Sequence, residues 1–189
     1  MVVGSSWGGM RALATLLGGL PHDLDAAVVL AQHRGVTSTG ALATALQSHS
    51  ALPVAEVEDK DPIEPGRVYL APADYHVLVE RGWCSLSVSE RVQYSRPSVD
   101  VLFESAADSY GGVVAAVVLT GTNADGAEGL LRVRKAGGVT IVQDPADAEQ
   151  AAMPAAAIAT GAADKVLPLS DIAPLLVRLC GRLDGGAGP

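Results

Sequence analysis

The chain has 189 residues, of which 49% are apolar and only 4% aromatic, and it carries a formal net charge of -8. This length fits one domain with a sizeable core, and the high apolar fraction argues against disorder. The negative charge argues against nucleic acid or an anionic membrane surface as the main partner, because binding to phosphate requires clustered Lys and Arg.

Two distant cysteines, Cys84 and Cys180, show no spacing typical of a metal site. Together with the absence of a signal-peptide pattern, they indicate reduced thiols and a cytoplasmic location. No apolar run approaches the roughly 20 residues that span a bilayer, so no direct membrane insertion is expected. No metal or cofactor is expected either, and residues 184–189 predict a flexible tail.

Short apolar runs without polar alternation recur along the chain and predict strands buried on both faces, as in a parallel sheet. These runs are Val2-Val3, Ala26–Ala31, Val68–Ala71, Val113–Leu119, Val139–Val142 and Lys165–Leu169. Between most of them, apolar residues recur at helical spacing. The predicted helical faces are Met10, Leu13 and Leu17, then Val99, Leu102, Ala106 and Tyr110, then Ile172, Leu175, Leu176 and Leu179.

This alternation predicts one doubly wound α/β domain over residues 1–183, with a mainly parallel sheet and helices on both faces. One segment departs from the pattern. Two short alternating runs with a turn between them, at about residues 76–88, predict a local antiparallel hairpin.

Three polar side chains follow predicted strands. Ser6 follows Val2-Val3, His33 follows Ala26–Ala31, and Asp125 lies in the segment after Val113–Leu119. Because sites in open α/β sheets form beyond the carboxyl ends of the strands, the three are expected at the same rim.

The pattern Gly4-x-Ser6-x-Gly8 is typical of a nucleophile elbow, a sharp turn where Cβ atoms beside the serine would collide with neighbouring elements. A serine is a poor nucleophile without an adjacent base. His33 is the candidate base, and Asp125 would accept its other ring N–H and stabilise the imidazolium. The hypothesis requires Ser6 and His33 to lie within hydrogen-bond reach.

Other interpretations of these residues stay open. Ser6 could be the N-cap of the helix that contains Met10. Asp125, with Glu128 three residues later, resembles a capping box for the predicted helix Ala127–Lys135. The glycine-rich turn could hold a phosphate, although it matches neither G-x-G-x-x-G nor the Walker pattern. His76 is expected to be structural.

Arg11, Arg34 and Arg96 lie near the predicted rim. They could attract an acidic partner against the overall negative charge, or they could be ordinary solvated arginines.

Several collinear motifs resemble the catalytic domain of the chemotaxis protein-glutamate methylesterase (CheB-type) family along nearly the whole chain. They are Gly4–Gly9, Val29–His33, Gly66–Pro72, Arg96–Phe103, Thr120-Gly121 with Asp125–Leu130, and Gln143-Asp144 with Met153-Pro154. The family's catalytic residues fall on Ser6, His33 and Asp125. The resemblance implies hydrolysis of glutamate γ-methyl esters on the cytoplasmic helices of chemoreceptors, in two-component signalling, and in some members deamidation of glutamines.

Two positions depart from the family pattern. Trp7 stands where the family has a small or hydroxyl residue, so the indole could narrow the site. The family's Thr-Gly-Met-Gly stretch reads Thr120-Gly121-Thr122-Asn123. In the family the methionine amide helps to bind the oxyanion, a role that Thr122 N–H could take with Gly8 and Gly121 beside it. Asn123 would be strained if the position needs a positive φ.

Most well-known members carry an N-terminal phosphoryl-receiver domain, for which this chain has no room. An alternative function is a catalytically weakened module of the same fold that binds a receptor or another partner, with Trp7 and Asn123 as its support. A third possibility is a flavodoxin-like nucleotide binder at the Gly4–Gly9 turn.

Overall fold

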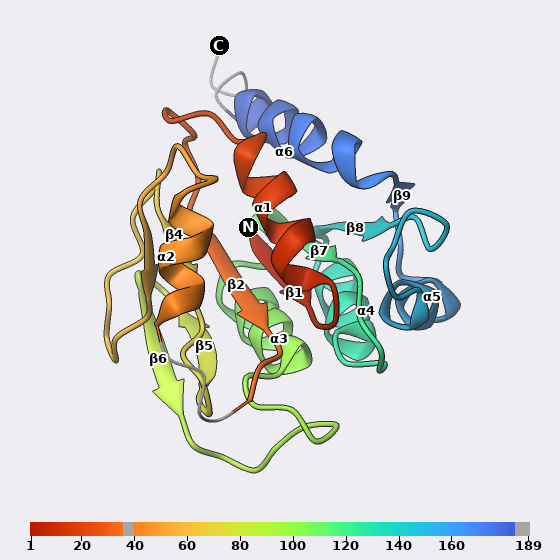
Figure 1. Cartoon of the computed structure of the whole chain (residues 1–189), viewed down its shortest axis with the longest axis horizontal. Coiled ribbons are helices and arrows are strands. Elements are labelled where there is room, and N and C mark those ends of the chain that lie inside the picture. The colour runs from red at the N-terminus through yellow and green to blue at the C-terminus, as the bar shows by residue number, and fades with distance from the viewer. Residues whose placement is uncertain (36–39, 184–189) are drawn as a thin grey trace.

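A seven-stranded parallel sheet forms the centre of the computed structural model, which describes residues 1–35 and 40–183 (Figure 1). The predicted tail at 184–189 lies outside the described residues. The strand order is β3-β4-β2-β1-β7-β8-β9, and every neighbouring pair is parallel. In chain order the strands are β1 (Val2–Ser5), β2 (Val28–Gln32), β3 (Val54–Glu56), β4 (Val68–Leu70), β7 (Ala115–Val118), β8 (Val139–Gln143) and β9 (Lys165–Leu167).

Helices cover both faces of this sheet (Figure 1). One face packs against α1 (Gly9–Gly18), α2 (Ala41–Gln47) and α6 (Leu169–Leu183). The other packs against α3 (Val99–Tyr110), α4 (Ala127–Lys135) and α5 (Ala152–Ala159). Consecutive strand residues enter opposite cores: Val2 joins the α3 side and Val3 the α1 side. The doubly wound α/β prediction is therefore confirmed.

The predicted hairpin is also confirmed. It consists of β5 (His76–Glu80) and β6 (Trp83–Ser87), which pair in antiparallel register as a separate two-stranded sheet. The hairpin is joined to α3 by hydrogen bonds in both directions, since Val79 N donates to Ser105 Oγ (3.0 Å) and Ser109 Oγ donates to Val79 O (2.7 Å). These bonds hold the hairpin against α3, and His76 at the start of the hairpin accepts from Ser98 N at the N-terminus of that helix.

Several element predictions need correction. Val113 lies in a short 3-10 helix (Gly111–Val113), and Leu169 begins α6 instead of ending a strand. Met10 is 42% exposed, because α1 turns Ala12, Leu13, Leu16 and Leu17 inward. The patterns in the sequence do not predict β3, α2 or α5. In α5 nearly every residue is small and apolar, so no amphipathic contrast marks it.

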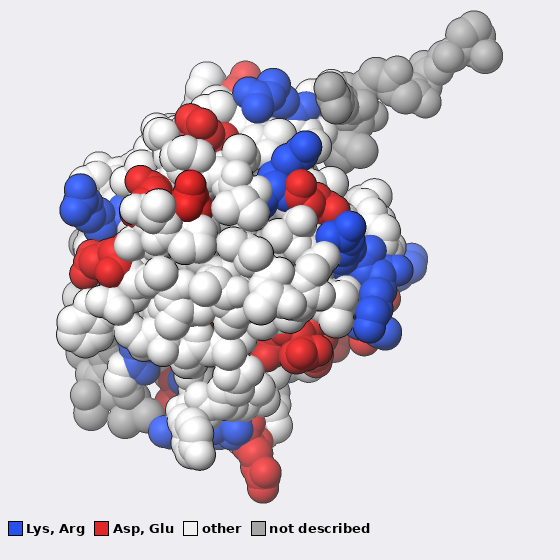
Figure 2. All heavy atoms as spheres, turned by 90° about the vertical axis from the view of Figure 1, so that its right-hand side faces the viewer, with Lys and Arg blue, Asp and Glu red and all other residues white. Residues whose placement is uncertain are grey.

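The side that carries α5 and β9 has a broad central area without charged side chains, with both signs of charge around it (Figure 2). No helix in the described part of the chain is long and apolar enough to cross a bilayer.

No disulfide joins Cys84 and Cys180, and burial raises the pKa of the Cys84 thiol to about 12.

Candidate active site

The three predicted site residues lie beyond the carboxyl ends of three adjacent strands. The chain leaves the central strand β1 toward β2 and later returns to β7 on the other side of β1. Such a reversal of direction opens a crevice at the strand ends. Ser6 follows β1 directly, His33 follows β2, and Asp125 lies in the loop between β7 and α4.

The turn that carries Ser6 requires its glycines. A Cβ on Gly4 would lie 2.1 Å from Val99 Cγ1, and Gly8 has a φ of 78°, which favours glycine. Gly8 is the N-cap of α1 and no side chain caps that helix, so the interpretation of Ser6 as an N-cap is wrong. Ser6 N donates to Thr120 O (2.9 Å), which ties the turn to the end of β7.

Gln32, a residue that sequence reasoning left without a role, joins the ends of β1 and β2. Its Oε1 accepts from Ser5 Oγ (2.6 Å), and its Nε2 donates to Ser6 O and His33 O (both 2.8 Å). In the sequence, the one sign of this role is that Gln32 is a polar residue directly after the apolar run Ala26–Ala31. The strands pair Ser5 with Gln32, and His33 N donates to Ser5 O (3.0 Å), so Ser6 and His33 follow side by side.

A short bond joins His33 Nε2 to Asp125 Oδ2 at 2.6 Å, with the two side chains 10% and 0% exposed. Asp125 also accepts from Ser98 Oγ (2.8 Å), Val99 N (2.7 Å) and Asp100 N (3.0 Å) at the N-terminus of α3. Burial alone would raise the pKa of Asp125, but the bonds from His33 and these amides outweigh it and lower that pKa. Asp125 is therefore ionised at neutral pH.

The capping-box interpretation of Asp125 is wrong. The N-cap of α4 is Gly126, which makes no side-chain cap bond. The carboxylate instead serves the N-terminus of α3, a helix that precedes it in the chain, where helix amides favour negative charge.

His76 has the structural role expected of it. It is fully buried, its Nδ1 accepts from Ser98 N (3.1 Å), and its Nε2 donates to Glu90 O (3.0 Å). Burial lowers the pKa of His76 below its ordinary value of 6.5, so the ring is neutral. A neutral ring is needed, because only then can Nδ1 accept the Ser98 amide. His76 thus positions the residue that donates to Asp125.

The free nitrogen of His33 is Nδ1. Nε2 faces an ionised carboxylate and donates to it, so in the neutral ring that a general base requires the lone pair is on Nδ1. Its hydrogen-bond partner is Ser95 Oγ, at a long 3.4 Å. The predicted bond from Ser6 is not formed: no hydrogen bond joins Ser6 Oγ to another described residue. The Ser6 side chain is only partly buried, so its hydroxyl can bond to solvent. In enzymes without bound substrate, catalytic hydrogen bonds are often long, and they tighten only when substrate binds.

Two backbone N–H groups near Ser6 are available to a negatively charged oxygen. Within the described residues, neither Trp7 N nor Thr122 N has a hydrogen-bond partner, whereas Gly121 N donates to Gln150 O (3.0 Å). Asn123 does not have a positive φ, and its Oδ1 accepts from Asp125 N (3.3 Å), so its replacement of glycine causes no strain. Trp7 is 64% exposed, which places it on the surface.

Asp100 binds the N-terminus of α4, whereas Asp125, just before α4, binds the N-terminus of α3. Asp100 Oδ1 accepts from Gly126 N (2.9 Å) and Gly129 N (2.7 Å) at the start of α4. Burial, together with the neighbouring Asp125, raises the pKa of Asp100 from 3.8 to about 6, although the two amides oppose the shift. The pair holds α3, α4 and the Asp125 carboxylate together.

Asp100→Asn is expected to stabilise the protein at pH 7 by about 1–3 kcal/mol, because the amide oxygen still accepts both bonds and the repulsion from Asp125 is removed. With a folded pKa of about 6 and an unfolded value of 3.8, the wild type binds more protons when folded, so its stability falls as pH rises from about 4 to 6. The variant should lose this component of the pH dependence. Urea unfolding from pH 4 to 8 measures both effects; an unchanged pH profile would contradict this account.

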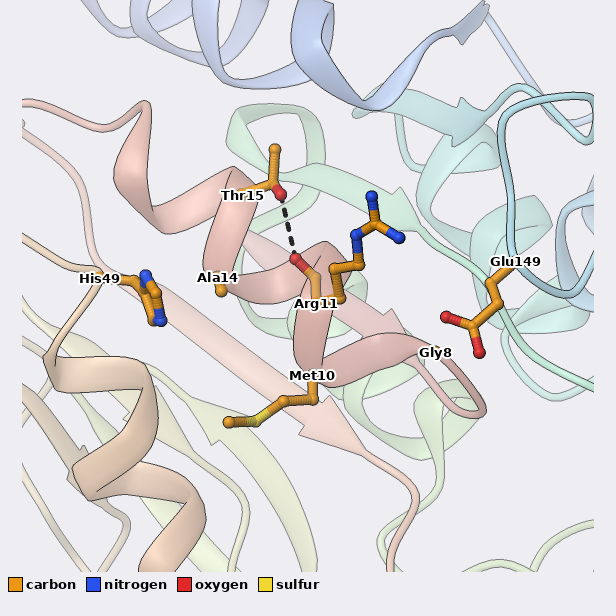
Figure 3. Close-up of a pocket in the computed structure, with 7 residues that line it drawn as sticks. All are labelled: Gly8, Met10, Arg11, Ala14, Thr15, His49 and Glu149. Carbon is orange, nitrogen blue, oxygen red and sulfur yellow. Dashed lines mark hydrogen bonds between the residues drawn. The ribbon is translucent and has the colours of Figure 1, made fainter.

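A pocket of about 480 Å³ lies beside α1 and includes none of Ser6, His33 and Asp125. Figure 3 shows the exposed Arg11 side chain extending toward Glu149, with His49 on the opposite side of α1. Arg11 is thus a surface residue. Arg34 and Arg96 are not ordinary solvated arginines, since their side chains are 6% and 16% exposed.

Within residues 1–35 and 40–183, no three His, Cys, Asp or Glu are grouped to hold a metal ion.

A doubly wound parallel sheet with a glycine-flanked serine and a His–Asp pair at one rim is an arrangement typical of α/β carboxyl-ester hydrolases, the class to which the following comparisons assign the chain. The sequence model of the CheB methylesterase family matches residues 1–176. The chain belongs to this family.

Proteins with related sequences can be aligned with most of this chain. A Leptospira interrogans protein with the provisional name protein-glutamate methylesterase/protein-glutamine glutaminase is 43% identical over 95% of this chain and 93% of its own length. A protein-glutamate methylesterase/protein-glutamine glutaminase from Anaeromyxobacter dehalogenans is 44% identical over 91% of the chain, which spans only 50% of that protein. The crystal structure of the Thermotoga maritima CheB methylesterase catalytic domain superposes with a TM-score of 0.90 at 37% identity, covering 94% of this chain and 96% of that one.

Proposed function

We propose that this protein hydrolyses glutamate γ-methyl esters on the cytoplasmic helices of chemoreceptors, with Ser6 as nucleophile, His33 as base and Asp125 as the residue that orients the base. The observation that carries the proposal is the 2.6 Å bond between His33 and a buried, ionised Asp125, beside a glycine-flanked serine on the next strand. The names of the relatives support an ester or amide of a glutamate side chain as the substrate.

In the proposed reaction, Ser6 Oγ attacks the ester carbonyl while His33 Nδ1 takes its proton. Asp125 keeps its negative charge and stabilises the imidazolium through Nε2. The N–H groups of Thr122 and Trp7 bind the oxyanion, and the imidazolium returns the proton to the departing methanol. A water molecule, deprotonated by His33, then attacks the γ-glutamyl ester of Ser6. The imidazolium returns the proton to Ser6 Oγ, which leaves, and the receptor keeps a glutamate side chain.

The test is release of methanol from receptor membranes that carry labelled γ-methyl glutamate. The wild type is expected to release labelled methanol with multiple turnovers, and unmethylated receptors should yield none. If the receptors keep their label at saturating protein, the proposed activity is rejected.

One observation favours a second candidate, a partner-binding module of the same fold: Ser6 Oγ makes no bond to His33 in this structure. Retention of receptor fragments on the immobilised protein without any methanol release would support that alternative.

A further inference from the structure

Three arginines surround a small cavity beside His33. Arg34, Arg91 and Arg96 line a space of about 120 Å³ that His33 also lines. The cavity is large enough for a carboxylate group and lies on the side of His33 where Nδ1 faces Ser95.

The lining of the cavity carries arginines and no carboxylate. Asp74 accepts from two arginines through one oxygen, since its Oδ1 lies 3.1 Å from Arg91 Nη2 and 2.8 Å from Arg96 Nη2. Arg34 Nη2 lies 2.8 Å from Glu56 Oε1. Three guanidinium groups therefore line the cavity, and the carboxylates that pair with them lie outside its lining. The lining itself includes no Asp or Glu.

Arg34 also has unused hydrogen-bond donors. Its side chain is 6% exposed, and its Nη2 donates to Ala71 O. Its Nε and Nη1 are buried and have no hydrogen-bond partner in the described part of the chain, and the same is true of the neighbouring Glu56 Oε1. Buried donors without partners cost free energy, and the planar fork of a guanidinium matches the two oxygens of a carboxylate. Arg34 is thus a lining residue whose hydrogen-bonding capacity is not fully used by its present partners.

The loop over the cavity has a strained backbone. Val92 and Ser95 exchange backbone hydrogen bonds (3.2 and 2.8 Å), and the residues between them, Gln93 and Tyr94, have φ values of 48° and 66°. This geometry is that of a type I′ turn, which normally takes Asn or Gly. The turn directs Ser95 toward His33 and leaves Tyr94 96% exposed at the cavity. Strain of this kind is retained mainly where a site needs it.

We propose that this cavity binds an acidic side chain of the protein substrate that lies next to the scissile ester. The proposal rests on the function proposed above. Because His33 lines the cavity, a group bound there belongs to the same stretch of substrate as the ester. On a helical substrate, side chains three or four residues apart share a face, with their Cβ atoms about 5–6 Å apart, so an acidic residue at such a position would accompany the ester.

The test uses helical peptides with one γ-methyl glutamate and a Glu or a Gln three or four residues before or after it. For the wild type, kcat/KM at the best position should be about tenfold higher for Glu than for Gln, a ratio typical of one charged hydrogen-bonded pair. Arg34→Gln should reduce this ratio to about one, and Arg91→Gln, at a more exposed position, should reduce it partly. Arg67→Gln is the matched control: Arg67 pairs with Glu64 at the other end of β4 and should leave the ratio unchanged.

Binding of the same peptides to the Ser6→Ala protein tests the cavity independently of turnover. A preference for Glu without hydrolysis by the wild type would overturn the proposed function and retain the acidic subsite. Equal kcat/KM and equal binding for the Glu and Gln peptides would overturn the subsite. Sodium acetate should inhibit cleavage of the Glu peptide competitively; acetate inhibition with no preference for Glu would mean that the cavity takes a free anion only, and would also overturn it.

Discussion

Ser6→Ala is expected to lower the rate of methanol release by about 10⁴-fold or more while leaving the fold intact. The large effect follows because the proposed mechanism has no second nucleophile at this rim. The small effect on stability follows because Ser6 Oγ bonds to no other described residue. The free energy of unfolding should change by no more than about 0.5 kcal/mol.

Ser95→Ala is the matched control, since Ser95 Oγ is the hydroxyl that lies 3.4 Å from His33 Nδ1. It should retain turnover within a few-fold of the wild type. A fluorophosphonate should label the wild type and Ser95→Ala at Ser6, as found by peptide mass, and should not label Ser6→Ala. If Ser6→Ala turned over normally and Ser95→Ala did not, the nucleophile would be Ser95.

Asp125→Asn is expected to lower kcat by about 10³- to 10⁴-fold, because an amide nitrogen facing His33 Nε2 would force the ring proton onto Nδ1 and remove the base. The substitution should also cost stability. Both carboxylate oxygens accept two bonds, Oδ1 from Ser98 Oγ and Asp100 N, and Oδ2 from His33 and Val99 N. An amide can accept on one side only, so about 1–3 kcal/mol of unfolding free energy should be lost.

Steady-state kinetics and urea unfolding measure the two effects separately. Asp108→Asn is the control, because Asp108 pairs with Arg132 on the exposed surface at 2.7 Å and should change neither quantity appreciably. A normal kcat in Asp125→Asn would rule out the orienting role, whatever happened to stability.

The sequence alone determined the fold class and two of the three candidate residues. Unbroken apolar runs such as Ala26–Ala31 indicate strands buried on both faces, and parallel strands place their carboxyl ends at one edge. Ser6 and His33 follow such runs directly, so their placement needed no long-range information. The need for glycine at position 4 could also be predicted, from the Gly-x-Ser-x-Gly pattern. The structure shows the reason, since the close approach of Val99 leaves no room for a Cβ.

Only the tertiary structure decided against a capping role for Asp125, because from the residue and its neighbours alone a cap for the helix that follows was the favoured interpretation. The choice depends on where the N-terminus of α3 lies, and that position is set by the order of strands β2, β1 and β7. The same holds for Gln32 and Arg34, whose partners come from other strands and loops. Local patterns record which side of an element is buried, whereas hydrogen bonds between distant segments exist only once the sheet has brought those segments together.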